Sequence, residues 1–324
     1  MKPIRSLLLA ATVAALSATP AQAQTKWDLP AAYPSGNFHT NNLALFAGEV
    51  KAATGGKLEI TVHPNASLFK APEIKRAVQG GQAQIGEILL VAYANEWPIF
   101  GADGLPFLAD SYDSAMKLYR AQKPLLDKKL GEQDMMLLYA VPWPPQGLYT
   151  KKPIAAAADL KGVKWRAYSP ATARIAELVG AQPVTVQAAE LSQAMATGVV
   201  ESYMSSGSTG ADTKTYEHLK FWYDTQAWLP KDAVIVNKAA FDKLDKATQD
   251  AVMKAAATAE TRGLEASKKV NTESLDKLRA GGMQILPPSP QLKADLQKVG
   301  ETMLKEWLEK AGPEGQALVD AFRK

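Results

Sequence analysis

The sequence predicts an α/β protein of two lobes with mostly parallel sheets. Apolar residues alternate between helical and strand spacing along the chain, which is typical of proteins in which helices cover parallel sheets. Pairs of glycines follow several of the helical segments, and glycine commonly ends a helix. A chain of 324 residues is also long enough for two domains.

The first predicted elements form a strand–helix–strand unit. Residues 26–33 are expected to form a strand, residues 37–53 a helix and residues 58–62 a second strand. The helix has its larger apolar residues at spacings of three and four, namely Leu43, Phe46 and Val50. A unit of this kind places its two strands parallel, with a right-handed connection.

The same alternation predicts the rest of the chain. Helices are expected at 71–80, 111–130, from Ser169 onward, 191–197, 238–279 and at the C-terminal end. Strands are expected at 83–90, 135–141, 162–168, 199–204, 221–225, 233–236 and 283–286, and Trp143-Pro144-Pro145 is expected to break regular structure. Ligands of such sheets bind at the carboxyl ends of the strands.

The N-terminal residues predict an export signal. Lys2 and Arg5 precede an apolar run over residues 7–16, and Ala21-Gln22-Ala23 offers small residues for cleavage. The run is shorter than the roughly 20 residues of a membrane helix, although an N-terminal anchor remains the alternative. We therefore expect residues 1–23 to be a signal peptide, cleaved near Ala23, and the mature protein to be periplasmic.

Charge and cysteine content narrow the class of protein. The chain has 37 Lys and Arg residues against 33 Asp and Glu residues, with no basic block, so nucleic acid is not expected as a partner. It has no cysteine, which excludes a lipid anchor. A mature chain of about 300 residues buries enough surface to fold without disulfides.

Catalytic motifs are scarce. His39, His63 and His218 are far apart and lack a metal-binding spacing. The segment at residues 205–210 matches neither a nucleophile elbow nor a phosphate-binding loop. A pair of catalytic carboxylates remains an alternative, because the two residues of such a pair can be far apart in sequence and close in the fold. We expect no catalytic residue, metal or cofactor.

Arg166 is the candidate anchor for an anion. It lies in the predicted strand at 162–168, which leads into a helix beginning at Ser169-Pro170. A guanidinium can pair with a carboxylate through two parallel hydrogen bonds, and a helix N-terminus favours the same anion. A structural salt bridge is the alternative. Aromatic residues near predicted strand ends would supply flat walls for a pocket; they are Tyr93, Trp97, Trp143, Tyr203 and Trp222.

Several segments resemble the solute-binding proteins of TRAP (tripartite ATP-independent periplasmic) transporters, in their dicarboxylate-type branch. The segments include Leu105-Pro106-Phe107-Leu108, Asp159-Leu160-Lys161-Gly162-Val163-Lys164-Trp165-Arg166 and Thr197-Gly198-Val199-Val200-Glu201. The resemblance covers essentially the whole mature chain. It implies a two-lobe periplasmic binding protein of the type II-like class, with hinge strands, a long connecting helix and an enclosed organic acid held by Arg166.

The resemblance also implies partners and lobe boundaries. The acid would be delivered to a permease with one small and one large membrane subunit, driven by an ion gradient, and no catalysis would occur. Lobe I is expected at 24–143 plus 230–267, and lobe II at 144–229 plus 268–324. The alternatives are a ligand-presenting partner of a receptor kinase and, less favoured, a periplasmic hydrolase.

Departures from the family pattern narrow the expected ligand. Gln146 stands where relatives that bind larger or doubly charged acids carry a second arginine, and Ser205 replaces an amide. A second ligand carboxylate would lack a partner, so we expect a monocarboxylate, such as a 2-oxo or 2-hydroxy acid with an apolar or aromatic tail. The expected ligand contacts are Arg166, Gln146, Trp143, Ser205, Tyr93, Trp222, Phe38, His39, Asn42 and Tyr203.

Overall fold

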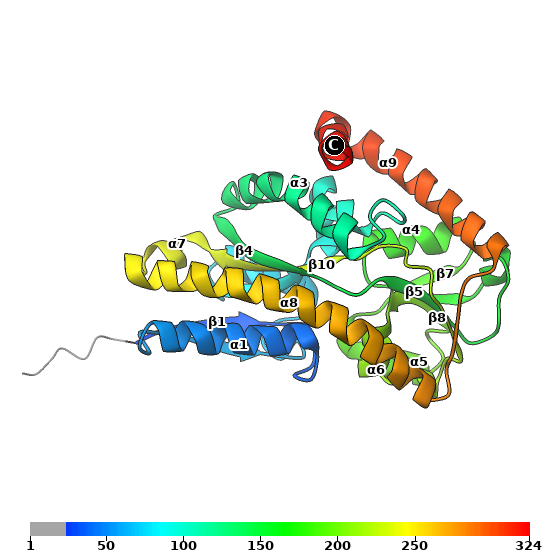
Figure 1. Ribbon diagram of the computed structural model, residues 1–324, viewed down its shortest axis with the longest axis horizontal. Coiled ribbons are helices and arrows are strands. Elements are labelled where there is room, and N and C mark those ends of the chain that lie inside the picture. The colour runs from blue at the N-terminus through cyan, green and yellow to red at the C-terminus, as the bar shows by residue number, and fades with distance from the viewer. Residues whose placement is uncertain (1–23) are drawn as a thin grey trace, which may run out of the picture.

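The structure is a computed structural model that describes residues 24–324. The predicted signal peptide, residues 1–23, lies outside the described residues. The chain folds into two α/β lobes that share a long helix (Figure 1).

Lobe I contains a two-stranded and a three-stranded sheet. Strand β1 pairs parallel with β2, and β10 lies between β3 and β4, antiparallel to both. The strands are β1 (Thr25–Pro30), β2 (Leu58–His63), β3 (Ile85–Leu89), β4 (Met135–Pro142) and β10 (Lys231–Asn237), and the helices are α1 (Phe38–Ala53), α2 (Ile74–Gln79), α3 (Tyr112–Gly131) and α7 (Lys238–Asp242).

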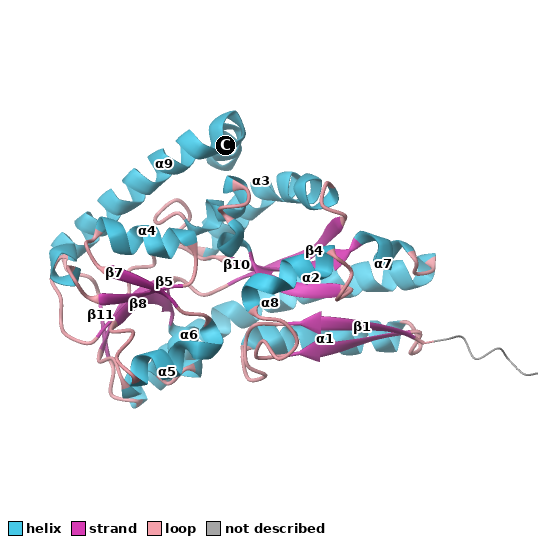
Figure 2. Cartoon of the chain, turned by 180° about the vertical axis from the view of Figure 1, so that it is seen from behind, coloured by secondary structure: helices cyan, strands magenta, loops and turns pink. Residues whose placement is uncertain are grey.

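Lobe II is built on a six-stranded sheet of order β11-β9-β5-β8-β6-β7. Helix α4 lies on one side of this sheet, and α5 and α6 lie on the other (Figure 2). The strands are β5 (Gln146–Thr150), β6 (Lys164–Ala167), β7 (Gln182–Thr185), β8 (Ser202–Ser206), β9 (Phe221–Tyr223) and β11 (Gln284–Leu286), and the helices are α4 (Pro170–Leu178), α5 (Leu191–Ala196) and α6 (Gly207–Asp212).

Four segments connect the lobes. The chain crosses between β4 and β5 and again between β9 and β10, and every antiparallel pairing among the described strands involves β5 or β10. Helix α8 (Lys246–Ala280) contacts α1 and β4 in lobe I and α6 and β11 in lobe II. Helix α9 (Pro290–Arg323) packs on α3 and α4 and is kinked at Gly312, whose φ of 60° suits glycine.

Close packing fixes α8 against lobe I. A Cβ atom at Gly263 would lie 2.4 Å from Val141 Cγ2 and 2.8 Å from Asn42 Nδ2, so only glycine lets α8 approach β4 and α1 this closely. Asn42 Nδ2 in turn donates to Ala259 O over 2.9 Å. The helix is therefore held rigidly on lobe I before it reaches lobe II.

The structure confirms the predicted two-lobe α/β fold and corrects some elements. Strands β5 and β7 have no counterpart in the predictions, and the strand predicted at 199–204 begins later, at Ser202, because Gly198 has a φ of 70° and forms a turn. The helix predicted at 238–279 is two helices, since Asp245 caps α8 by accepting from Thr248 N. The predicted lobe boundaries stay a prediction.

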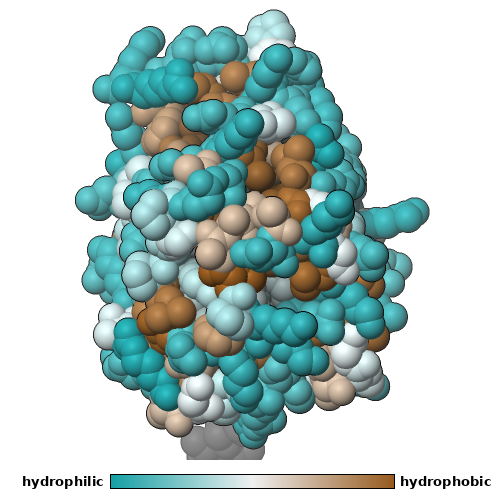
Figure 3. All heavy atoms as spheres, turned by 90° about the vertical axis from the view of Figure 1, so that its right-hand side faces the viewer, coloured by the Kyte–Doolittle hydropathy of each residue, from teal (hydrophilic) through white to brown (hydrophobic). Residues whose placement is uncertain are grey.

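The face at the lobe II end is mostly hydrophilic and carries several separate apolar patches (Figure 3). Over residues 24–324, no helix combines the length and apolar character needed to cross a membrane.

Candidate functional site

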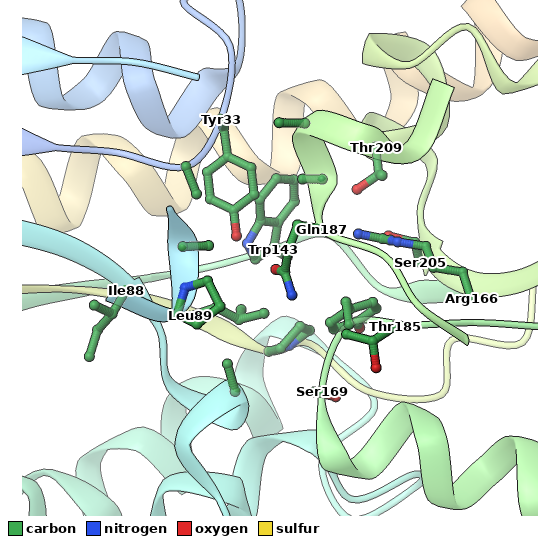
Figure 4. Close-up of a pocket in the computed structure, with 18 of the residues that line it drawn as sticks. Tyr33, Ile88, Leu89, Trp143, Arg166, Ser169, Thr185, Gln187, Ser205 and Thr209 are labelled. Carbon is green, nitrogen blue, oxygen red and sulfur yellow. The ribbon is translucent and has the colours of Figure 1, made fainter. Parts of the chain in front are cut away.

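A cleft of about 590 Å³ lies between the lobes, within the roughly 300–1,000 Å³ typical of small-molecule sites. Tyr33 and Leu89 face it from lobe I, and Arg166, Thr185 and Ser205 face it from lobe II (Figure 4). Most of these residues lie at or just beyond strand ends, the position where α/β sheets bind ligands.

Arg166 is the cationic side chain among the described residues that line the cleft. It lies on β6 and is 3% exposed, and its Nε donates to Val186 O over 2.9 Å. The charged or ionisable neighbours that act on its pKa are tyrosines, not carboxylates. The described part of the chain therefore offers no structural salt bridge to Arg166, and its guanidinium is free to pair with an anion.

Two tyrosine rings hold the guanidinium in place. Arg166 Cζ lies 4.9 Å from the ring centroid of Tyr168 and 5.7 Å from that of Tyr203, both within the range of a cation–π contact. Burial lowers the pKa of Arg166, but a guanidinium stays protonated. Burial also raises the pKa of Tyr203 to about 12, so its phenol is neutral and does not cancel the charge.

The N-terminus of α4 reinforces the positive wall. Ser169 accepts from Thr172 N and caps the helix, and Pro170 occupies its first turn. Both residues line the cleft beside Arg166. The helix dipole therefore adds to the attraction of an anion at this wall, as the sequence predicts.

Aromatic side chains form the opposite wall. Trp143 lines the cleft at the crossing between β4 and β5, and its ring centroid lies 4.9 Å from that of Tyr33 at an interplanar angle of 70°. Trp143 Nε1 donates to Asp232 Oδ2 over 3.1 Å, and the Tyr33 hydroxyl donates to Oδ1 over 3.3 Å. Both rings are thus oriented by a single buried carboxylate.

Asp232 belongs to a buried cluster with Glu87 and His39. The imidazole nitrogen and carboxylate oxygens that could act as metal ligands lie within 4.8 Å of one another, close enough for a single cation to contact all three. Burial lowers the pKa of His39 and raises those of Glu87 and Asp232, the last to about 8. Two carboxyls this close favour sharing one proton, which leaves the cluster with one negative charge instead of two.

The proton resides mainly on Glu87. Asp232 accepts two hydrogen bonds, which stabilise its ionised form. Glu87 Oε2 has no hydrogen-bond partner among the described residues, and Oε1 lies 3.9 Å from His39 Nδ1. Because Glu87 also lines the cleft, its carboxyl is a neutral group with both a donor and an acceptor.

Replacing Asp232 with asparagine is expected to weaken the pH dependence of stability. Burial raises the pKa of both Glu87 and Asp232, that of Asp232 from 3.8 to about 8, so the pair holds a proton in the folded protein that the unfolded chain has lost. The free energy of unfolding of the ligand-free protein therefore falls as pH rises from 4 to 8. In the variant this fall should be smaller by about 1 kcal/mol or more. Urea titrations at pH 4, 6 and 8 measure it, and an unchanged fall contradicts the shared proton.

Gln146 links the segment that crosses between the lobes, at Pro144, to Tyr168 beside Arg166. Its Nε2 donates to Pro144 O over 2.8 Å, and its Oε1 accepts from the Tyr168 hydroxyl over 3.2 Å. Tyr168 lies against Arg166, so Gln146 supports the tyrosine that orients the arginine. The amide supplies no second positive charge, in line with a ligand that carries one carboxylate.

The structure brings together one group of the predicted contacts. Arg166, Gln146, Trp143, Ser205 and Tyr93 all line the cleft. The Tyr93 hydroxyl donates to Ala71 O over 3.1 Å, which fixes its ring at the lobe I side.

The other predicted contacts lie behind the lining residues. Trp222 packs beneath β5, where a Cβ at Gly147 would be 2.3 Å from its ring. The Tyr203 hydroxyl pairs with Thr215 Oγ1 over 2.5 Å, so this ring backs Arg166. Neither side chain is part of the cleft lining, because both are used in the lobe II core.

The predicted contacts on α1 also lie behind the wall. Phe38 and His39 pack on Trp143, with ring centroids 5.3 Å and 4.4 Å from its ring. Asn42 points to α8, where it binds Ala259 O and accepts from Arg262 Nε. The first strand–helix turn does reach the cleft, but through Tyr33 and Asn37.

Several lining residues are absent from the sequence prediction. Tyr33 and Tyr168 come shortly after strands β1 and β6, so the strand-end rule applied to every strand would have identified them. Thr185 and Gln187 lie at the end of β7, a strand that the prediction omits. The sequence shows Glu87 as a charged residue within an apolar segment. It does not show that Glu87 lies near Asp232, because this depends on β3 and β10 being neighbours in the sheet.

A hydrogen bond between the lobes closes one edge of the cleft. Asn37 Nδ2 donates to Asp212 Oδ2 over 2.7 Å, joining the loop after β1 to α6. Both residues line the cleft. Because the contact joins the two lobes across the cleft, we expect it to favour the closed state and to slow ligand release.

Replacing Asp212 with alanine is expected to speed ligand dissociation by about 2- to 10-fold, the worth of one net hydrogen bond. Stopped-flow fluorescence of Trp143 and the other tryptophans measures the rate. Asp212→Asn is the matched control, since its amide oxygen still accepts from Asn37. Equal dissociation rates in the alanine variant and the wild type would show that this contact does not hold the lobes closed.

The fold and the cleft define a class of protein. Two α/β lobes that enclose a buried arginine with no carboxylate partner among residues 24–324 are typical of a binding protein for a small anionic solute. The family model of the bacterial extracellular solute-binding proteins, family 7, matches residues 31–311. The chain belongs to this family, whose members act outside the cytoplasm as binding proteins rather than enzymes and serve TRAP permeases.

Solved structures with the same fold include close relatives. An extracytoplasmic solute receptor from Bordetella pertussis, which binds pyroglutamic acid, is 63% identical, with a TM-score of 0.91, and the match covers 92% of this chain and 99% of the receptor. A marine metagenome TRAP solute binding protein specific for pyroglutamate is 46% identical, with a TM-score of 0.91, over 93% of this chain and 99% of its own. These likenesses confirm the predicted family.

A more distant relative binds another class of acid. The monocarboxylate 2-oxoacid-binding periplasmic protein of Nostoc sp. is 22% identical over 287 residues, which cover 87% of this chain and 79% of that protein.

Proposed function

We propose that this protein captures pyroglutamate, or a closely similar small cyclic monocarboxylate, and delivers it to a TRAP permease without chemical change. The observation that carries the proposal is Arg166, a buried guanidinium in a closed cleft with no carboxylate partner among residues 24–324. One cation fits one ligand carboxylate. The relatives that are 63% and 46% identical to this chain bind pyroglutamate.

The lining of the cleft matches the chemical character of such a ligand. The aromatic wall of Tyr33 and Trp143 gives a flat apolar surface for a small ring, and the α4 N-terminus lies beside the carboxylate end. A ligand held by Arg166 on lobe II and by the aromatic wall on lobe I contacts both lobes. Binding therefore favours the closed state.

A 2-oxo acid is the second candidate for the ligand, because the relative from Nostoc binds that class. It would use Arg166 in the same way but has no N–H group to donate to the acceptor oxygen of the Glu87 carboxyl. Neither a receptor-kinase partner nor a hydrolase gains support from the relatives.

Two experiments test the proposal. Mass spectrometry of small molecules released by denaturing the purified protein is expected to detect pyroglutamate. After refolding without ligand, melting curves with a panel of lactams, 2-oxo acids, 2-hydroxy acids and dicarboxylates should show the largest shift for pyroglutamate. A ligand at 100 times its dissociation constant adds about 2.7 kcal/mol, so a panel with no shift at millimolar concentration contradicts the proposal.

A further inference from the structure

Glu87 is a polar residue of the cleft that has no role in the binding of a carboxylate by Arg166. It lies on β3, its side chain is 3% exposed, and it lines the cleft on the lobe I side. Its Oε2 has no hydrogen-bond partner among the described residues. A buried carboxyl without partners is destabilising, so its retention here needs a compensating role.

Glu87 and Arg166 line the same cleft. The Tyr33 hydroxyl donates to Asp232 Oδ1 over 3.3 Å, and Tyr33, Glu87 and Arg166 all line the same cleft. Tyr33 faces the cleft between the lobes (Figure 4). A ligand lying on the Tyr33 and Trp143 rings, with its carboxylate on Arg166, therefore presents its other end toward Glu87.

The partner of Glu87 on the protein side is a carboxylate. Asp232 accepts hydrogen bonds from Trp143 and Tyr33, which lower its pKa against the effect of burial and which Glu87 Oε2 lacks among the described residues. Its Oδ2 lies 3.6 Å from His39 Nε2, and burial keeps His39 neutral. The proton of the pair therefore stays on Glu87, which presents an O–H donor beside a C=O acceptor.

We propose that the Glu87 carboxyl recognises the cis-amide edge of a lactam ligand, accepting its N–H and donating to its C=O. A lactam holds these two groups side by side, and a neutral carboxyl holds the complementary pair in the same plane. This inference rests on the proposed function and makes Glu87 the residue that selects a lactam over other small monocarboxylates.

A pair of ligands isolates this interaction. L-Pyroglutamate and its lactone analogue, 5-oxotetrahydrofuran-2-carboxylate, share the ring, the carboxylate and the C=O, and differ in that oxygen replaces N–H. The wild type is expected to bind the lactam more tightly by on the order of 10- to 100-fold, because the lactone leaves the acceptor of Glu87 unpaired. Equal affinities for the two ligands would overturn the inference.

Two variants test the role of Glu87 itself. Glu87→Gln keeps a donor and an acceptor side by side and should keep most of the preference for the lactam. Glu87→Met has similar length but neither group, so the two ligands should bind within about 3-fold of each other. A wild-type preference in the methionine variant, or its complete loss in the glutamine variant, contradicts the inference.

The outcome separates this inference from the proposed function. If neither ligand binds the wild type, the proposed function fails. If both bind in an Arg166-dependent manner with equal affinity, only the role of Glu87 fails. Melting curves of the ligand-free variants verify folding, and the wild-type comparison of the two ligands decides the question even if the methionine variant does not fold.

Discussion

Replacing Arg166 with alanine is expected to weaken pyroglutamate binding by about 30- to 4,000-fold. Removing one partner of a buried charge pair costs roughly 2–5 kcal/mol, and Arg166 is 3% exposed and supplies the positive charge of the cleft among the described residues. Calorimetric titration of the ligand-free protein measures the effect. Arg166→Lys should fall in between, because it keeps the charge but loses the planar fork.

The matched control is Arg174→Ala. Arg174 lies on α4 and pairs with Glu306 and Glu177 at the surface, outside the cleft lining. Its removal should leave the dissociation constant within about 2-fold of the wild type, because surface ion pairs contribute little. A dissociation constant within 3-fold of the wild type in Arg166→Ala would contradict the assignment of the anchor.

Replacing Asp103 with alanine is expected to lower the free energy of unfolding by about 3–5 kcal/mol, since it leaves a buried charge without its partner. Asp103 and Lys231 are both 0% exposed at their side chains, and Nζ lies 3.8 Å from Oδ2. Asp103 Oδ2 also accepts from Lys231 N over 2.8 Å. The pair anchors the start of β10, where the chain returns to lobe I.

Urea unfolding of the ligand-free protein at pH 7.5 measures this effect. Burial raises the pKa of Asp103 to about 6 while Lys231 opposes the shift, so the carboxyl is ionised under these conditions. Asp250→Ala is the control, because the Lys246–Asp250 pair is exposed and should change stability by less than about 0.5 kcal/mol. The double variant Asp103→Leu, Lys231→Met should recover much of the loss. A small effect in Asp103→Ala would show that the buried pair is not a stabilising anchor.

Local sequence patterns predicted the elements whose periodicity is long and undisturbed. The spacing of apolar residues predicts helix α1 and strands β1 and β2 directly. Strand β5 was missed because Trp143-Pro144-Pro145 precedes it, and a break in regular structure does not indicate which element comes next. Its residues are all buried, and it lies between β8 and β9 in the sheet, an arrangement formed by segments distant in sequence.

The position of Arg166 in the cleft was predictable, and the polar detail of the cleft was not. Arg166 stands at a strand end before a capped helix, and both features are local. The predicted contacts on α1 lie behind the cleft lining, because the side that a helical side chain faces depends on its neighbours: Asn42 faces α8. Glu87 acquires its role only because β3 and β10 pair and bring Asp232 beside it.

Calorimetric titration of the refolded, ligand-free protein with L-pyroglutamate tests whether this chain binds pyroglutamate without chemical change. We expect one ligand per chain with a dissociation constant in the micromolar range or tighter, and recovery of unchanged pyroglutamate after the protein is denatured. The absence of saturable heat at millimolar ligand would contradict this expectation, and so would consumption of the ligand.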